Sequence, residues 1–106
     1  MQNPNQKCID ECVKCAQICY SCFDACLKEG NVAERTDCLK ALIECAKCCE
    51  MSAFLMSTNS NFAKEHCKLC ADMCNDCSKH CSKFPEQHCK ECADECKICA
   101  DECSKM

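Results

Sequence analysis

The sequence predicts an all-α fold: an antiparallel up-down-up-down four-helix bundle with a cysteine-lined core. Twenty of the 106 residues are cysteine, and most step by three and four residues, which places side chains on one helical stripe. One glycine and two prolines leave little material for tight β-turns. Short connections make sequential helices antiparallel neighbours. The three cysteine runs are Cys8, Cys12, Cys15, Cys19, Cys22, Cys26; Cys67, Cys70, Cys74, Cys77, Cys81; and Cys89, Cys92, Cys96, Cys99, Cys103.

Capping and turn residues mark the ends of the first helix and the start of the second. Asn3 and Pro4 fit an N-cap and a first helical residue, and Gly30 favours the end of that helix. Asn31 followed by Glu34 resembles a capping box for the second helix. We therefore expect the first two helices at about residues 4–29 and 32–57.

Two later breaks complete the organisation. The polar segment 57–61 has N-cap chemistry, and Pro85 suits the start of the last helix, with Phe84 extended before it. The third and fourth helices are expected at about residues 61–83 and 86–104, within a single domain of residues 1–106.

The second helix departs from the regular repeat. Its cysteines are Cys38, Cys45, Cys48 and Cys49, and Leu42 stands where the repeat would place sulfur. The helix order also predicts that the two ends of the bundle differ. One end should be capped by hydrocarbon from Met51, Phe54, Leu55, Met56 and Phe62. The other should hold Cys26, Cys38, Cys81 and Cys89, with His80 and His88 beside them as an entrance for ions.

A second stripe runs along the first helix, one residue away from its cysteines. It either packs against a neighbouring helix or forms a contact between subunits. The third and fourth helices carry mostly Lys, Asn, Ser and Ala at the corresponding positions. The stripe consists of Ile9, Val13, Ala16, Tyr20, Phe23 and Leu27.

A buried stripe of thiols predicts a site for soft metal ions, and charge decides which ion. Residues three or four apart on a helix have Cβ atoms about 5–6 Å apart, so consecutive thiols can converge on one ion. About five tetrahedral Zn²⁺ sites would use all the cysteines and bury a charge of about −10. Cu(I), selected by thiolate softness, can approach one ion per sulfur and leave the core close to neutral.

Other functions are possible within the same sequence. A zinc or cadmium thiolate buffer of metallothionein type remains an alternative, as does a redox protein using CxxC pairs such as Cys19/Cys22. Iron–sulfur clusters are disfavoured because CxxC pairs inside a continuous helix do not wrap a cluster. No nucleophile with an oriented base is evident, so we expect the protein not to be an enzyme. His66 is interpreted as a surface histidine.

Composition limits the partners. A net charge of −4 without a basic stripe argues against nucleic-acid binding. No stretch is apolar enough for a membrane span, and the N-terminal MQNPNQK lacks the regions of a secretion signal, so we expect a cytoplasmic location with reduced thiols.

The segments CIDECVKCAQICYSCFDAC, CKLCADMCNDCSKHC and CKECADECKICADEC resemble the bacterial copper storage proteins, specifically their cytosolic branch. The resemblance implies many Cu(I) ions bound along the core, mainly by thiolate pairs, a homotetramer, and ion entry at a histidine-bearing end. The predicted function is high-capacity Cu(I) storage and buffering. The predicted metal ligands are all twenty cysteines together with His80 and His88.

Overall fold

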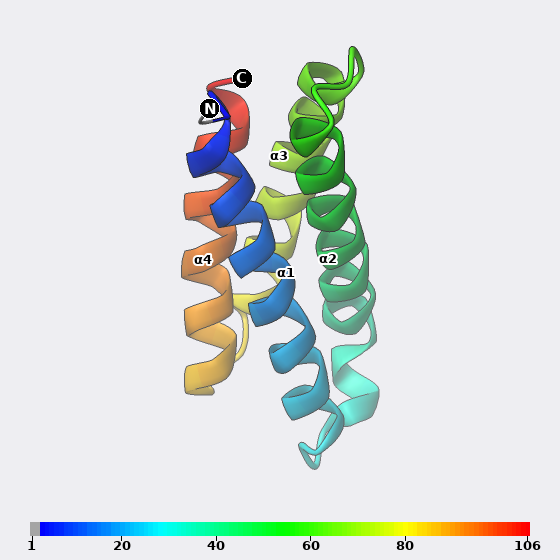
Figure 1. The fold of residues 1–106 in the computed structure, drawn as a ribbon. Helices are drawn as coiled ribbons and strands as arrows, with labels where there is room; N and C mark the ends of the chain where they lie inside the picture. Colours follow the sequence, from blue (N-terminus) through cyan, green and yellow to red (C-terminus); the bar gives the residue numbers. More distant parts are fainter. Residues whose placement is uncertain (1–2) are drawn as a thin grey trace.

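In the computed structural model, which describes residues 3–106, the chain forms four α-helices and a short 3₁₀ helix. These are α1 (Gln6–Leu27), the 3₁₀ helix η1 (Val32–Arg35), α2 (Thr36–Ser57), α3 (Ala63–Cys81) and α4 (Gln87–Ser104). Figure 1 shows an antiparallel bundle in which both chain termini and the α2–α3 connection lie at one end. The other end, called the His88 end below, holds the remaining two connections. The predicted all-α bundle is confirmed; residues 1 and 2 of the predicted domain lie outside the described residues.

The stripes of cysteine decide which face of each helix is buried. Helix α1 packs on α2 and α4, and α3 packs on the same two helices, so all four stripes meet along one axis. The bundle is elongated, with extents of 47 × 20 × 17 Å. Alanines such as Ala46 and Ala100 fill the remaining buried positions, and their small side chains let the helices approach closely. Sulfur therefore occupies the volume that leucine fills in an ordinary bundle.

The helix starts differ from the predicted capping. The side-chain oxygen of Asn3 accepts a hydrogen bond from the backbone N–H of Asn5 at 2.8 Å, and α1 begins only at Gln6. Asn3 also donates to the carbonyl of Met56 at 3.1 Å, which ties the start of the chain to the end of α2. The predicted capping box at Asn31 is wrong: its side chain makes no capping hydrogen bond, and residues 32–35 form the 3₁₀ helix instead of the first α-helical turn.

The predicted hydrocarbon cap is largely wrong as well. Met56 is fully buried and Leu55 is partly buried against the core, but Met51, Phe54 and Phe62 are exposed. A cap needs side chains that turn across the axis, whereas these three lie on the outer faces of their elements. The exposed apolar side chains are instead available for contacts outside the chain.

Candidate metal centre

All twenty cysteines lie within the described residues, and each is buried and free. All except Cys48 gather along the bundle axis, and we call this set the thiol column. Its sulfur atoms contact one another mainly across helices: the Sγ–Sγ distance is 3.6 Å for Cys12–Cys103 and 3.6 Å for Cys45–Cys74. The sequence predicted close pairs along single helices, and such pairs also occur, as in Cys22–Cys26 at 4.0 Å. Antiparallel packing adds the cross-helix pairs, which the repeat alone does not specify.

Four-thiol groups occupy the middle of the thiol column. Within each group the sulfur atoms lie within 4.8 Å of one another. Neighbouring groups share members: Cys15 belongs to the first two groups, whereas Cys19 and Cys96 belong to the second and third. These groups cannot all be filled as separate closed tetrahedra, because each shared sulfur would have to bridge two ions. The three groups are Cys15, Cys49, Cys74, Cys99; Cys15, Cys19, Cys45, Cys96; and Cys19, Cys77, Cys92, Cys96.

A mixed group of imidazole and thiols closes the His88 end. The Nδ1 atom of His88 lies 3.4 Å from Sγ of Cys22 and 3.5 Å from Sγ of Cys89, and Cys26 completes the group. The opposite ring nitrogen, Nε2, lies 3.1 Å from a carboxylate oxygen of Glu29. A carboxylate at the outer nitrogen orients a metal-binding histidine and fixes its tautomer. The predicted position of His88 beside the thiols agrees with this geometry.

A buried arginine, which the sequence analysis missed, adjoins the same group. Arg35 is 0% exposed, and its Nη1 donates to Sγ of Cys26 at 3.6 Å and of Cys89 at 3.5 Å. Its Nη2 pairs with Glu86 at 2.6 Å, and its Nε donates to Asn31 at 2.7 Å. The guanidinium thus places a permanent positive charge beside two thiols. No sequence signal marked it, because the single arginine lies outside the cysteine repeat and is of a type usually found at the surface.

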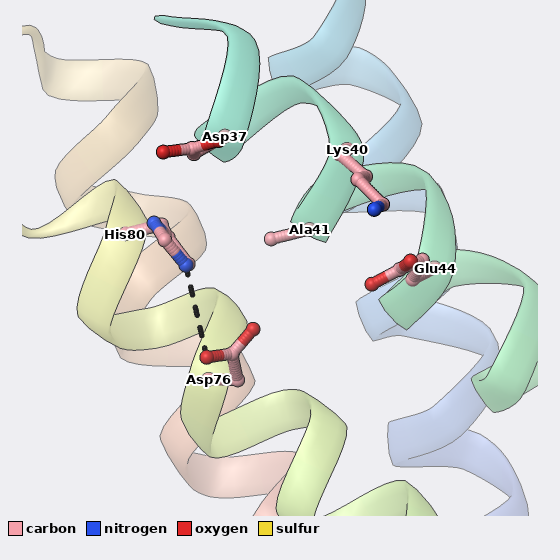
Figure 2. Close-up of a pocket in the computed structure, with 6 residues that line it drawn as sticks. All are labelled: Asp37, Lys40, Ala41, Glu44, Asp76 and His80. Carbon is pink, nitrogen blue, oxygen red and sulfur yellow. Dashed lines mark ion pairs between the residues drawn. The ribbon is translucent and has the colours of Figure 1, made fainter.

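His80 occupies a different place. Figure 2 shows it in a surface pocket between α2 and α3, facing Asp37 and Lys40 across the pocket. Its Nε2 lies 3.7 Å from a carboxylate oxygen of Asp76, one turn earlier on the same helix. The structure therefore places His80 beside acidic side chains and brings His88 to the thiols. Ligation by His80 stays a prediction.

His66 was interpreted as a surface residue, but the structure brings it to a thiol. Its Nε2 lies 3.8 Å from Sγ of Cys48, and its Nδ1 lies 2.7 Å from Oγ of Ser52. No spacing signal singled it out, because all three histidines directly precede a cysteine.

Burial disfavours the charged form of the thiols in the metal-free column. Burial, with the neighbouring Cys26, raises the pKa of Cys89 to about 12 although Arg35 acts in the opposite direction. Hydrogen bonding with Cys15 and other neighbouring thiols, together with burial, raises the pKa of Cys96 above its ordinary value. A neutral thiol is inexpensive to bury, whereas a thiolate needs a compensating cation. Each thiol that binds a metal ion therefore releases a proton, and the resulting thiolate pairs with the positive ion.

Comparison with known proteins gives a consistent result. The chain is 39% identical to the Cu(I)-bound copper storage protein BsCsp3 of Bacillus subtilis, with a TM-score of 0.91 over 95% of each chain. A copper storage protein from Streptomyces lividans, described as cytosolic and solved with five coppers, is 34% identical, with a TM-score of 0.92 over 95% of this chain and 89% of that one. The same Streptomyces protein has been solved with 10 copper equivalents.

A sequence relative, the uncharacterized cysteine-rich protein YhjQ of Bacillus subtilis, is 38% identical over 69 residues. The match covers 65% of this chain and 64% of the relative, so it spans less than two thirds of that protein. The copper storage protein family model matches residues 1–106. Together with the shared fold, this match shows that the chain belongs to the copper storage protein family.

Proposed function

We propose that this protein is a non-enzymatic, high-capacity store and buffer for Cu(I) in the cytosol. The observation that carries the proposal is the sharing of Cys15, Cys19 and Cys96 between neighbouring four-thiol groups. Shared sulfurs suit ions that accept two or three ligands and that sit beside one another along a column. A cytosolic location is supported by the free state of the cysteines and by the description of the Streptomyces relative.

Charge balance favours Cu(I) over Zn²⁺ in this core. Four thiolates around Zn²⁺ leave a charge of about −2 at each closed site, and the surrounding core offers few cations to neutralise it. One Cu(I) per thiolate leaves no net charge, and thiolate softness selects this ion. Arg35 is the one fully buried cation among the described residues, and it lies at the His88 end rather than in the middle of the column.

A redox protein is the weaker alternative. CxxC chemistry works through one exposed, reactive thiol and its partner. Here each central sulfur has several thiol neighbours at similar distances: Cys49 lies 3.7 Å from Cys70, 3.7 Å from Cys74 and 3.9 Å from Cys99. Such a network has no unique exchange pair, and it is shielded from bulk solvent.

Anaerobic titration of the reduced protein tests the proposal. Cu(I) is added in competition with a chelator of known affinity, and Zn²⁺ is titrated in parallel. We expect the Cu(I) count to rise well above the roughly five ions that closed tetrahedral sites allow. A Cu(I) count near five, with Zn²⁺ bound more tightly, would contradict the copper-storage assignment and favour the zinc or cadmium buffer.

We also propose that the chain assembles as a homotetramer. Along the second stripe of α1, Ile9 and Ala16 are buried within the chain, whereas Val13 and Leu27 are exposed. A groove of Val13, Ala16, Tyr20 and Ala53, with Gln17 and Glu50 at its rim, runs between α1 and α2. Replacing Val13 with Glu should shift the sedimentation of the protein towards smaller species, whereas an unchanged sedimentation profile would argue against this interface.

A further inference from the structure

The adjacent cysteines Cys48 and Cys49 face different parts of the bundle. Successive residues of an α-helix project about 100° apart, so only one member of the doublet can face the axis. Cys49 does so, with its sulfur 3.7 Å from those of Cys70 and Cys74. Cys48 turns towards α3 and meets His66. It is the cysteine that the thiol column does not use.

Ser52 holds His66 in an orientation suited to ligation. Its hydroxyl, fully buried one turn after Cys48, lies 2.7 Å from Nδ1 of His66. When Nδ1–H donates to this oxygen, the lone pair of Nε2 points towards Cys48. A hydrogen bond at the outer nitrogen is the usual device that orients a metal-binding imidazole. Ser52 thus has the role at His66 that Glu29 has at His88.

The spacing of Cys48 and His66 fits a shared ion. Bonds from a metal such as Zn²⁺ to Cys and His are about 2.3 and 2.0 Å, so two ligand atoms on one ion lie within about 4.3 Å of each other. The observed Sγ–Nε2 distance is 3.8 Å, which requires no movement of either helix. The corresponding distances at His88 are 3.4 and 3.5 Å.

Cys48 is also connected to the thiol column. Cys48 is the chain neighbour of Cys49, which faces the column. Cys70 lies 3.7 Å from Cys49 and 3.9 Å from Cys74. His66 is partly exposed, whereas Cys48 is only 6% exposed. The pair formed by His66 and Cys48 therefore lies between the surface and the core.

We propose that His66 and Cys48 form a further Cu(I) site, a lateral port between α2 and α3 through which ions pass into the thiol column. The inference rests on the proposed function, because it takes Cu(I) as the cargo. Entry is a ligand exchange without oxidation or reduction. Cu(I) leaves its donor ligand and bonds to Nε2 of His66 and Sγ of Cys48, while the thiol proton of Cys48 passes to solvent. Exchange onto a thiol of the column then vacates the port, and the proton of that thiol passes to Cys48.

Loading kinetics of the full-length reduced protein test the port. Cu(I) is supplied from a chelator, and uptake is followed in the wild type, His88→Ala, His66→Ala and the double variant, with Lys68→Ala, a change at an exposed position of α3, as the matched control. We expect the double variant to load at least about tenfold more slowly than His88→Ala, with a capacity change of at most about one ion. A double variant that loads as fast as His88→Ala overturns the proposal.

X-ray absorption gives a second readout at low copper loading. In His88→Ala we expect Cu–N scattering to persist and to be lost when His66→Ala is added. Cu–N scattering unchanged by His66→Ala would also overturn the port. The wild-type titration separates this failure from failure of the storage function: full Cu(I) capacity with no effect of His66 removes the port alone. Ser52→Ala keeps His66 as a ligand but removes the hydrogen bond that orients its ring. A rate of Cu(I) loading between those of the wild type and His66→Ala supports the orienting role of Ser52.

Discussion

Nη1 of Arg35 lies 3.5 Å from Sγ of Cys89, so a fixed positive charge touches the thiol column at the end where His88 lies. Two thiolates on one Cu(I) carry a net charge of −1. A guanidinium beside Cys26 and Cys89 can neutralise that charge without a second metal ion. The His88 end is thus suited to holding a single ion, whereas the central groups depend on neighbouring ions for neutrality.

Replacing Arg35 with Met should weaken both the fold and the binding of copper at this end. The change leaves Glu86 without its partner and Asn31 without its donor, so the free energy of unfolding should fall. Chemical denaturation of the reduced, copper-free protein measures this loss. Arg35→Lys is the matched control, because it keeps the charge but cannot make all of the guanidinium contacts. Equal stability of Arg35→Met and the wild type would contradict the role assigned to this side chain.

Replacing His88 with Ala should slow Cu(I) loading and release more than it lowers capacity. The imidazole lies at the outer edge of the column and contacts two of its thiols, so it acts where ions are exchanged. Stopped-flow transfer from a chelator measures the rates, and equilibrium titration measures the capacity. Lys90→Ala, a change at an exposed position two residues after His88, should leave both unchanged. A large loss of capacity at unchanged rates would show that the entrance lies elsewhere.

Removing a shared sulfur should cost more than one bound ion. Cys96 belongs to two four-thiol groups, whereas Cys8 belongs to a three-thiol group with Cys12 and Cys103. We therefore expect Cys96→Ala to lose more Cu(I) than Cys8→Ala in the same titration. Each substitution removes one small buried group and should cost about 1 kcal/mol of stability. Equal losses of capacity would indicate that the groups fill independently.

The stability of the copper-free protein should fall as the pH rises from about 4.5 to about 8. Glu95 is only 4% exposed, and burial, reinforced by the neighbouring carboxyl of Glu11, raises its pKa to about 8. Between these pH values the unfolded chain releases a proton that the folded protein retains, so rising pH favours unfolding. Glu95→Gln should therefore be more stable than the wild type at pH 8, by roughly 2 kcal/mol, with little difference at pH 4.

Denaturant unfolding at the two pH values checks this expectation. Asp94→Asn is the matched control, because it removes the same charge from the exposed face of α4. If Glu95→Gln shows the same pH dependence as the wild type, the carboxyl is ionised in the folded protein and the burial argument is wrong.

The periodicity of the cysteines was enough to predict the bundle, because the three- and four-residue step fixes the helical state and the buried stripe together. It also placed His88 correctly, since helix order determines which ends meet. The pairing of sulfurs across helices was not predictable to the same degree. It depends on the relative rotation and height of α1 and α4, which bring Cys12 to Cys103, and no local pattern specifies these.

Residues outside the repeat were the ones predicted poorly. Arg35 looks like a surface charge in sequence, yet Asn31, Glu86 and two thiols satisfy its donors in the interior. Phe54 and Phe62 look like core residues, yet they are exposed. In both cases tertiary packing decides burial, and residue type alone gives the wrong answer.

Leu42 is 0% exposed and occupies a place along α2 where the repeat would have put another cysteine. The hydrocarbon side chain of Leu42 cannot bind an ion, so α2 carries no metal ligand between Cys38 and Cys45. Copper ions that move between these two cysteines have to pass through ligands on other helices. The first of these is Cys81, whose sulfur lies 3.7 Å from that of Cys38. We therefore expect the sites near Cys38 to exchange copper separately from those near Cys45, so that removal of Cu(I) by a chelator should occur in two phases.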